Sequence, residues 1–202
     1  MDRMVLSLVA YLIGAIPFGL LVAKSRGVDI RSQGSGNIGA TNVFRVIGKG
    51  WGILTFTLDA LKGFVPAFFF PMLLRSDASA EWGVLFGSCA ILGHSFPVYL
   101  RFKGGKGVAT GAGMLLGVAP VAVLIGFFCW LLCMVLSRIV SLSSIVAALS
   151  VIVSVWVLDR GPVINIVLTV LSLLVIWLHR ANIRRILSGT ENRFGNKKET
   201  GS

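Results

Sequence analysis

Long apolar runs separated by short polar connections make up most of the chain. Each run is nearly free of formal charge and reaches or approaches the ~20 residues with which a helix crosses a bilayer. The runs are Met4–Ala23, Trp51–Leu74, Trp82–Leu100, Gly107–Ser137, Ile139–Leu158 and Gly161–Leu178. This pattern predicts an all-α integral membrane protein with a single polytopic domain over residues 1–202 and a flexible tail at 193–202.

One of these runs is too long for a single crossing. A helix over Gly107–Ser137 would measure about 46 Å at ~1.5 Å per residue, against a hydrocarbon core of ~30 Å. The run contains Gly117 and Pro120, which are typical of a helix break. We therefore expect two helices, Val108–Val118 and Val121–Ser137, of which the first is too short to span alone and is half-buried in protein. The count is then seven transmembrane helices.

Composition indicates that lipid is the solvent of this chain. Apolar residues make up 55% of it, charged residues only 13%, and the mean hydropathy is +0.87. Soluble domains carry about twice that share of charge. The first apolar run is longer than the core of a signal peptide, about 7–15 residues, so we expect it to stay as a transmembrane helix.

The net charge of +11 is concentrated in a few connections. Basic residues mark cytoplasmic loops because they are hard to translocate. Three basic clusters and Arg138 are therefore assigned to the cytoplasmic side. The first cluster is Lys24, Arg26, Arg31, Arg45 and Lys49, and the second is Arg101, Lys103 and Lys106. The third is Arg180, Arg184, Arg185, Arg193, Lys197 and Lys198. The basic residues left for the other side are Arg3, Arg75 and Arg160. Seven crossings fit this asymmetry with the N-terminus outside and the C-terminus in the cytoplasm.

Four polar segments share the predicted cytoplasmic face and a similar composition. They combine glycine and hydroxyl or amide side chains with Arg or Lys, and they are Gly34–Arg45, Gly93–Thr110, Ser137–Ser144 and His179–Gly195. Glycine lets backbone N–H groups approach a ligand, and consecutive N–H groups form a nest for an anion. Arginine offers a planar fork that matches phosphate, and lysine offers a point charge. The segments therefore predict glycine-rich cytoplasmic loops that form a phosphate-binding site.

Simpler roles compete for some of these residues. Basic side chains next to a membrane commonly contact only anionic head groups, which is the simpler interpretation of Arg184, Arg185, Lys197 and Lys198. Ser35 and Thr41 are also suited to cap a helix N-terminus instead of binding a ligand.

Ionisable residues inside the predicted spans have structural alternatives too. Asp59 and Lys62 lie one helical turn apart and can pair on one helix face, which is their structural interpretation. His94 opens the second polar segment, and His179 ends the last span with Asn182 one turn later. A buried histidine bonded to backbone is the structural alternative, and we favour a functional role for both histidines.

A nucleotide site is excluded by context. Gly34-x-Gly36-x-x-Gly39 fits the dinucleotide fingerprint, with Asp59 about 20 residues further on, but that fingerprint requires a preceding β-strand and a transmembrane run precedes it here. The GGKG of Gly104–Gly107 lacks the spacing and the Ser/Thr of a P-loop. We expect neither a nucleotide nor a nucleic acid as partner.

Four motifs follow one another along the chain: GSGNIGATNVFR (Gly34–Arg45), DALKG (Asp59–Gly63), GHSFPVYLRFKGGKGVAT (Gly93–Thr110) and HRANIRRILSGTEN (His179–Asn192). In this order they resemble the bacterial acyl-phosphate-dependent glycerol-3-phosphate acyltransferases of the PlsY type. The apolar spans between them fit as well, so the resemblance covers nearly the whole chain. The family is described as having seven transmembrane helices with the N-terminus outside, which the charge pattern also predicts.

The resemblance implies transfer of a fatty acyl group from acyl phosphate to the 1-hydroxyl of sn-glycerol 3-phosphate, the first acylation of phospholipid synthesis. The products are 1-acyl-sn-glycerol 3-phosphate (lysophosphatidate) and phosphate. The expected partners are the two substrates and membrane lipid, at the cytoplasmic face of the bacterial inner membrane. Because acyl phosphate is an activated anhydride, we expect no covalent enzyme intermediate, no cofactor and no metal. Consistent with this donor, the chain has no H-x-x-x-x-D, since Tyr99 and Arg184 stand where the aspartate would follow each histidine.

Candidate site residues follow from the motifs. The catalytic candidates are His179, Asn182 and Ser35, and the substrate-binding candidates are Ser35, Asn37, Thr41, Asn42, Arg45, Lys106, Ser143 and Glu191. Ser35, Arg45 and Lys106 are expected to grip phosphate, while His179 and Asn182 orient the acyl phosphate. His179 is also a candidate base, because imidazoles titrate near neutral pH, and the substrate phosphate is the alternative base.

A transporter or channel for a phosphorylated small molecule is the main alternative function. It would also need basic inward loops, a broken helix and buried ions. Its expected signature is a polar site near the midplane and on the outer side, often with inverted repeats. The outer connections here are short and the polar residues concentrate on one face, which favours the enzyme.

Overall fold

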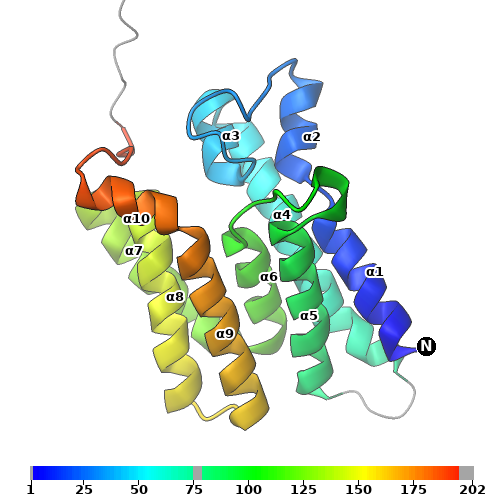
Figure 1. Ribbon diagram of the computed structural model, residues 1–202. Coiled ribbons are helices and arrows are strands. Elements are labelled where there is room, and N and C mark those ends of the chain that lie inside the picture. Colours follow the sequence, from blue (N-terminus) through cyan, green and yellow to red (C-terminus); the bar gives the residue numbers. More distant parts are fainter. Residues whose placement is uncertain (1, 75–78, 196–202) are drawn as a thin grey trace, which may run out of the picture. The chain divides into compact units, whose positions relative to one another are not determined.

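The computed structural model describes residues 2–74 and 79–195, and every regular element in these ranges is a helix (Figure 1). The helices are α1 (Arg3–Ala15), α2 (Phe18–Ser25), α3 (Ala40–Val46), α4 (Lys49–Phe69), α5 (Ala80–Ser95), α6 (Val108–Val118), α7 (Pro120–Ser137), α8 (Val140–Val157), α9 (Pro162–Leu178) and α10 (Arg180–Leu187), with 3₁₀ turns at Phe70–Leu73 and Val98–Leu100. Arg75, Lys197, Lys198 and most of the expected tail lie outside the described residues.

The all-helical prediction is confirmed for the described residues, and so is the expected helix break. The helix α6 ends at Val118 and α7 begins at Pro120. By length and composition, five helical stretches in the described ranges can each cross a membrane, and α9 with α10, bent by 54°, makes a sixth if counted as one span. Together with the short apolar helix α6, these elements occupy the predicted spans. The count of seven crossings and the sides of the termini stay predictions.

The first predicted span differs from expectation because it is broken. Pro17 has no N–H to donate, and α1 therefore ends at Ala15 and the chain restarts as α2 at Phe18. The carbonyl of Ile16 lies in this break. Its position becomes important for the site, because a polar group exposed by a break inside a membrane helix needs a partner within the protein.

Two compact units make up the fold, residues 1–120 and residues 121–202. In the first unit, α1 packs on α5 and α4 packs on α6 through small residues. A Cβ added at Gly14 would collide with the Ala90 backbone, and one added at Gly113 would collide with the Ala60 carbonyl. Such close backbone contact is how helices associate in lipid, where apolar burial alone gives little driving force.

The first unit has apolar clusters in two places. One joins the start of α1 to the end of α4 and to α5, through Leu6, Ala10, Phe70, Leu74 and Phe86. The other lies around α2 and α3 and contains Val22, Ala23, Ile30, Ile38 and Val43. The second cluster anchors the polar loop between α2 and α3 to the membrane helices.

The second unit is built from α7 to α10. The helix α8 packs on α9, and α10 contacts the ends of both. The chain after α10 returns to the α7–α8 connection, where Phe194 N donates to the Arg138 carbonyl at 2.6 Å. This return places the last polar segment beside the start of α8.

Candidate active site

The first glycine-rich segment is a loop that folds around one buried amide. Asn42 is 2% exposed. Its Oδ1 accepts from the Ser35 N–H at 2.9 Å, and its Nδ2 donates to the carbonyls of Ile30 and Gln33 at 3.1 and 3.0 Å. Gly34 packs against this amide with φ of 62°, where a Cβ would collide with the Asn42 oxygen. In this structure Asn42 therefore holds the loop, and its amide is fully occupied by backbone.

The other candidates of this segment are more accessible. Ser35, Thr41 and Arg45 are exposed, and Asn37 is half-buried with its Oδ1 accepting from the Gly39 N–H at 2.7 Å. The helix α3 starts at Ala40 with Gly39 as its N-cap residue. The alternative in which Ser35 or Thr41 caps a helix is therefore wrong. Both hydroxyls lie on the solvent-exposed side of the segment.

The second glycine-rich segment turns tightly at the C-terminal end of α5. Gly104 N donates to the Ser95 carbonyl at 3.2 Å, and Gly105 N donates to the His94 carbonyl at 3.1 Å. Gly105 is buried, and a Cβ there would collide with the His94 ring. These contacts fix the backbone directly before Lys106, which is half-buried one residue before the Gly107 cap of α6.

These two segments meet in the first unit. Arg31 Nη2 donates to the Lys103 carbonyl at 3.3 Å. Leu100 packs against the apolar cluster formed around α2 and α3. The structure thus brings the loop that carries Ser35 next to the loop that carries Lys106.

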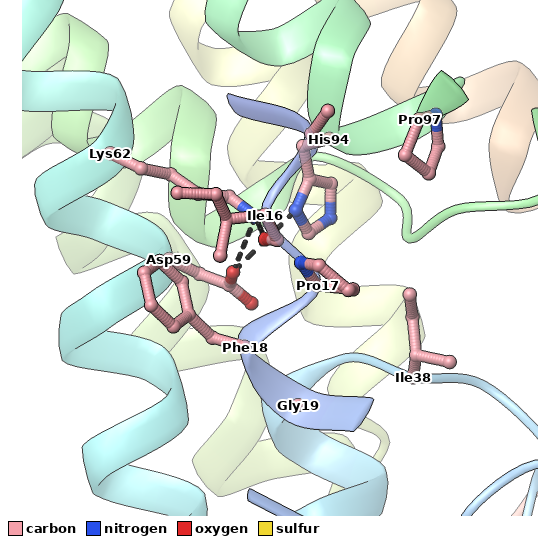
Figure 2. Close-up of a pocket in the computed structure, with 10 residues that line it drawn as sticks. Ile16, Pro17, Phe18, Gly19, Ile38, Asp59, Lys62, His94 and Pro97 are labelled. Atoms are coloured by element: carbon pink, nitrogen blue, oxygen red, sulfur yellow. Dashed lines mark hydrogen bonds and ion pairs between the residues drawn. The ribbon is translucent and has the colours of Figure 1, made fainter. Parts of the chain in front are cut away.

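Below the loops lies a buried ionic cluster of Asp59, Lys62 and His94 (Figure 2). Lys62 Nζ is 2.7 Å from Asp59 Oδ1 and donates to the Ile16 carbonyl at 2.7 Å. His94 Nδ1 lies 3.7 Å from Asp59 Oδ1. The predicted pairing of Asp59 with Lys62 on one helix face is confirmed. The three side chains also line a narrow pocket with Ile16 to Gly19, Ile38 and Pro97.

In the second unit, Glu191 joins three elements. Its Oε1 accepts from Ser141 Oγ on α8 at 2.7 Å and from Asn182 Nδ2 on α10 at 2.6 Å. Its Oε2 accepts from Arg185 Nε at 2.6 Å. In this structure the carboxylate orients Asn182, and the expected contact of Glu191 with substrate stays a prediction.

The charge state of Glu191 follows from these contacts. Burial by itself would raise the pKa of Glu191, but the hydrogen bonds from Asn182, Ser141 and Arg185 and the positive charge of Arg185 outweigh it and hold the pKa below its usual range. The carboxylate is therefore ionised at neutral pH.

His179 lies at the junction of α9 and α10 and is 3% exposed. Its Nδ1 is 2.8 Å from the Val175 carbonyl. A carbonyl only accepts, so Nδ1 donates this hydrogen bond, and in a neutral ring Nε2 is then the basic nitrogen.

Ser143 is fully buried and donates to the Ile139 carbonyl of its own helix at 2.9 Å.

Sequence reasoning missed two partners in this unit. Arg185 was assigned to lipid head groups, whereas its guanidinium binds Glu191 while staying 37% exposed. Ser141 was passed over in favour of Ser143, although both belong to the same polar segment. The residue that indicates such partners in the sequence is Glu191, because an acidic residue in a strongly basic tail needs hydrogen-bond donors when it is buried. In the described ranges, no group of three or more His, Cys, Asp or Glu is placed to hold a metal ion.

Known proteins that are similar to this chain in sequence and fold are described as glycerol-3-phosphate acyltransferases. A family model described as glycerol-3-phosphate acyltransferase matches residues 4–189. The glycerol-3-phosphate acyltransferase of Geobacter metallireducens is 51% identical over 185 residues, covering 92% of this chain and 94% of the relative. That of Geobacter sulfurreducens is 45% identical over 195 residues, covering 96% and 98%.

Solved structures agree with the family. The crystal structure of PlsY, an integral membrane glycerol 3-phosphate acyltransferase, in its glycerol 3-phosphate form matches with a TM-score of 0.90 and 42% identity, covering 96% of each chain. The lysophosphatidic acid form of PlsY matches with a TM-score of 0.87 at the same identity and coverage.

Replacing the carboxylate tests the role of Glu191. We expect Glu191→Gln to lower the free energy of unfolding by about 1–2 kcal/mol at pH 7, because an amide cannot accept as strongly from three donors. A lowered pKa stabilises the fold above the ordinary glutamate pKa of about 4.3, and this contribution is lost as the pH falls through the lowered value. Thermal unfolding in detergent should therefore show a gap between wild type and variant that closes below about pH 4.

The matched control is Glu81→Gln, which changes an exposed carboxylate in the first unit. It should not reproduce the gap at neutral pH. A gap for Glu191→Gln that is the same at pH 7 and at pH 3.5 would contradict the assigned role.

Proposed function

The chain belongs to the glycerol-3-phosphate acyltransferase family and is a membrane-embedded acyltransferase of phospholipid synthesis, and from this premise we propose the reaction in detail. It transfers a fatty acyl group from acyl phosphate to the 1-hydroxyl of sn-glycerol 3-phosphate, giving 1-acyl-sn-glycerol 3-phosphate and phosphate. The two crystal forms of PlsY, with glycerol 3-phosphate and with lysophosphatidic acid, support this acceptor and this product. Family membership sets aside the transporter alternative.

The observation that carries the proposal is the contact between the two glycine-rich loops of the first unit. The Arg31–Lys103 hydrogen bond and the packing of Leu100 hold the loops together. Between them they supply exposed hydroxyls, backbone N–H groups and the cations of Arg45 and Lys106. This is the chemistry that binds a phosphate monoester at a membrane surface.

With acyl phosphate as the donor, a covalent acyl-enzyme intermediate is unnecessary. The anhydride is already activated and phosphate is a good leaving group, so the protein need not form an acyl-enzyme. Its task is to hold two anions that repel one another, to orient the hydroxyl and to stabilise the developing oxyanion.

Residues of the first unit bind phosphate in this proposal. Ser35, Arg45 and Lys106 make the direct contacts, with Asn37 and Thr41 beside them. Asn42 contributes by holding the Ser35 amide in place.

Residues of the second unit act on the reacting groups. His179 takes the proton of the 1-hydroxyl at Nε2, since Nδ1 is engaged by the Val175 carbonyl. Asn182, whose side-chain amide donates to Glu191, orients the acyl phosphate, and Ser143 lies on the neighbouring helix α8.

The site faces the cytoplasm of the bacterial inner membrane. The distribution of basic residues supports this orientation. Arginine lies over a tryptophan ring at 5.1 Å for Arg26 and Trp51, at 4.0 Å for Arg180 and Trp177 and at 4.2 Å for Arg3 and Trp82. Such pairs are typical of a membrane–water interface and occur on both predicted faces.

Donor choice is tested with purified protein in detergent. We expect phosphate release when acyl phosphate and glycerol 3-phosphate are both present, because turnover needs no membrane barrier. Acyl-CoA of the same chain length should give no product. Equal rates with acyl-CoA, or phosphate release without glycerol 3-phosphate, would contradict the proposed reaction.

The base is tested by the pH dependence of turnover. We expect His179→Ala to lower kcat roughly 10²–10⁴-fold, the usual contribution of a general base, and to remove the acidic limb of the pH–rate profile. If the rate falls while the profile keeps its shape, the substrate phosphate accepts the proton instead.

A further inference from the structure

The buried ionic cluster of Asp59, Lys62 and His94 is not used by the chemistry described above. Its side chains are between 3% and 6% exposed, and all three residues lie inside predicted spans, Asp59 and Lys62 in one and His94 in the next. Charged groups at such depth are costly and remain only where they have partners and a function. The contacts of the cluster indicate that function, because Lys62 connects it to the first glycine-rich loop and His94 connects it to the second. Figure 2 shows the cluster beside the α1–α2 break and Ile38.

Lys62 connects the cluster to the first glycine-rich loop, which carries Ser35. Lys62 Nζ holds the Ile16 carbonyl in the break between α1 and α2 at 2.7 Å. Three residues later, Gly19 lies against the Ile38 carbonyl so closely that a Cβ would collide with it. Ile38 is buried and belongs to the loop that carries Ser35. The position of the break therefore sets the position of this loop.

Asp59 and His94 connect the cluster to the second glycine-rich loop, which carries Lys106. Asp59 Oδ1 faces His94 Nδ1 at 3.7 Å. The far side of the imidazole lies against Gly105, and the His94 carbonyl accepts from the Gly105 N–H at 3.1 Å. Gly105 is joined directly to Lys106. The orientation of the imidazole therefore sets the backbone that presents Lys106.

We propose that the Asp59–Lys62–His94 cluster is a positioning device that fixes the spacing between the phosphate-binding groups of the two loops. The inference rests on the proposed function for its kinetic consequence. A buried ion pair adds little net stability compared with apolar packing, but it permits few geometries and so specifies one arrangement. The cluster fixes the position of α4 relative to the α1–α2 break, through Lys62, and relative to α5, through Asp59 and His94. Ser35 and Lys106 are then held at a fixed separation before substrate arrives.

The kinetic test compares Asp59→Asn with Lys106→Ala. A positioning role predicts that Asp59→Asn raises the KM of the same phosphate substrate as Lys106→Ala does, by about tenfold, while kcat changes less than about threefold. The matched control is Leu6→Ala, a buried change in the apolar cluster away from the loops. It should lower the melting temperature and leave both KM values unchanged.

The double variant Asp59→Asn with Lys62→Met separates positioning from stability. Removing both charges should return the melting temperature toward that of wild type, because no uncompensated ion remains. The raised KM should persist, since the Ile16 carbonyl keeps the Phe18 N–H of its own turn but has lost the Lys62 contact that ties the break to α4. A folded double variant with wild-type KM values overturns the proposal.

A structural readout keeps the proposal testable apart from the reaction. Spin labels are placed at the exposed positions Gln33 and Lys103, one on each loop, after Cys89, Cys129 and Cys133 are replaced by alanine. We expect one narrow distance distribution in otherwise wild-type protein and after Leu6→Ala, and a broadened one after Asp59→Asn. If the distribution stays narrow in folded Asp59→Asn protein, the positioning role is wrong whatever reaction is catalysed. If the distribution broadens but wild type does not use acyl phosphate, only the proposed reaction fails.

Discussion

A buried polar group must find its hydrogen-bond partner inside the protein, both at membrane depth and within a polar loop, and the rest of the structure depends on this constraint. It acts at three side chains. Asn42 bonds to the backbone of the loop between α2 and α3, and Lys62 donates to the Ile16 carbonyl in the break at Pro17. Glu191, in the segment after α10, accepts from one donor on α8 and two on α10. Each of these side chains forms its hydrogen bonds with other groups of the protein. Ser35 and Arg45 stay exposed on the segment that Asn42 holds, and together with Lys106 they are the groups that we propose bind phosphate.

Polar residues of the motifs therefore fall into two kinds that look alike in sequence. Asn42 and Glu191 belong to the same motifs as Ser35 and His179, yet their side chains are fully used by internal hydrogen bonds. The two kinds differ in what a substitution changes, since loss of a holding residue alters stability and loop geometry before it alters chemistry.

Much of the fold could be predicted because its signals are local. The helix break between Val118 and Pro120 follows from Gly117 and Pro120 within one long apolar run. The break at Pro17 carries the same signal and was missed, because that run has an ordinary length and nothing forces a split. The helix α3 was also missed. Its composition disfavours a helix, but Val43 packs fully buried in the cluster around Ile30, and that tertiary contact overrides propensity. Pairs such as Ser141 with Glu191 join positions far apart in sequence and leave no local pattern.

Simultaneous binding of two phosphates without an acyl-enzyme is the central claim, and steady-state kinetics tests it most directly. Initial rates are measured while acyl phosphate is varied at several fixed concentrations of glycerol 3-phosphate. Direct transfer in a ternary complex predicts double-reciprocal lines that intersect. Parallel lines, with burst release of phosphate before glycerol 3-phosphate is added, would show a covalent acyl-enzyme and contradict the account.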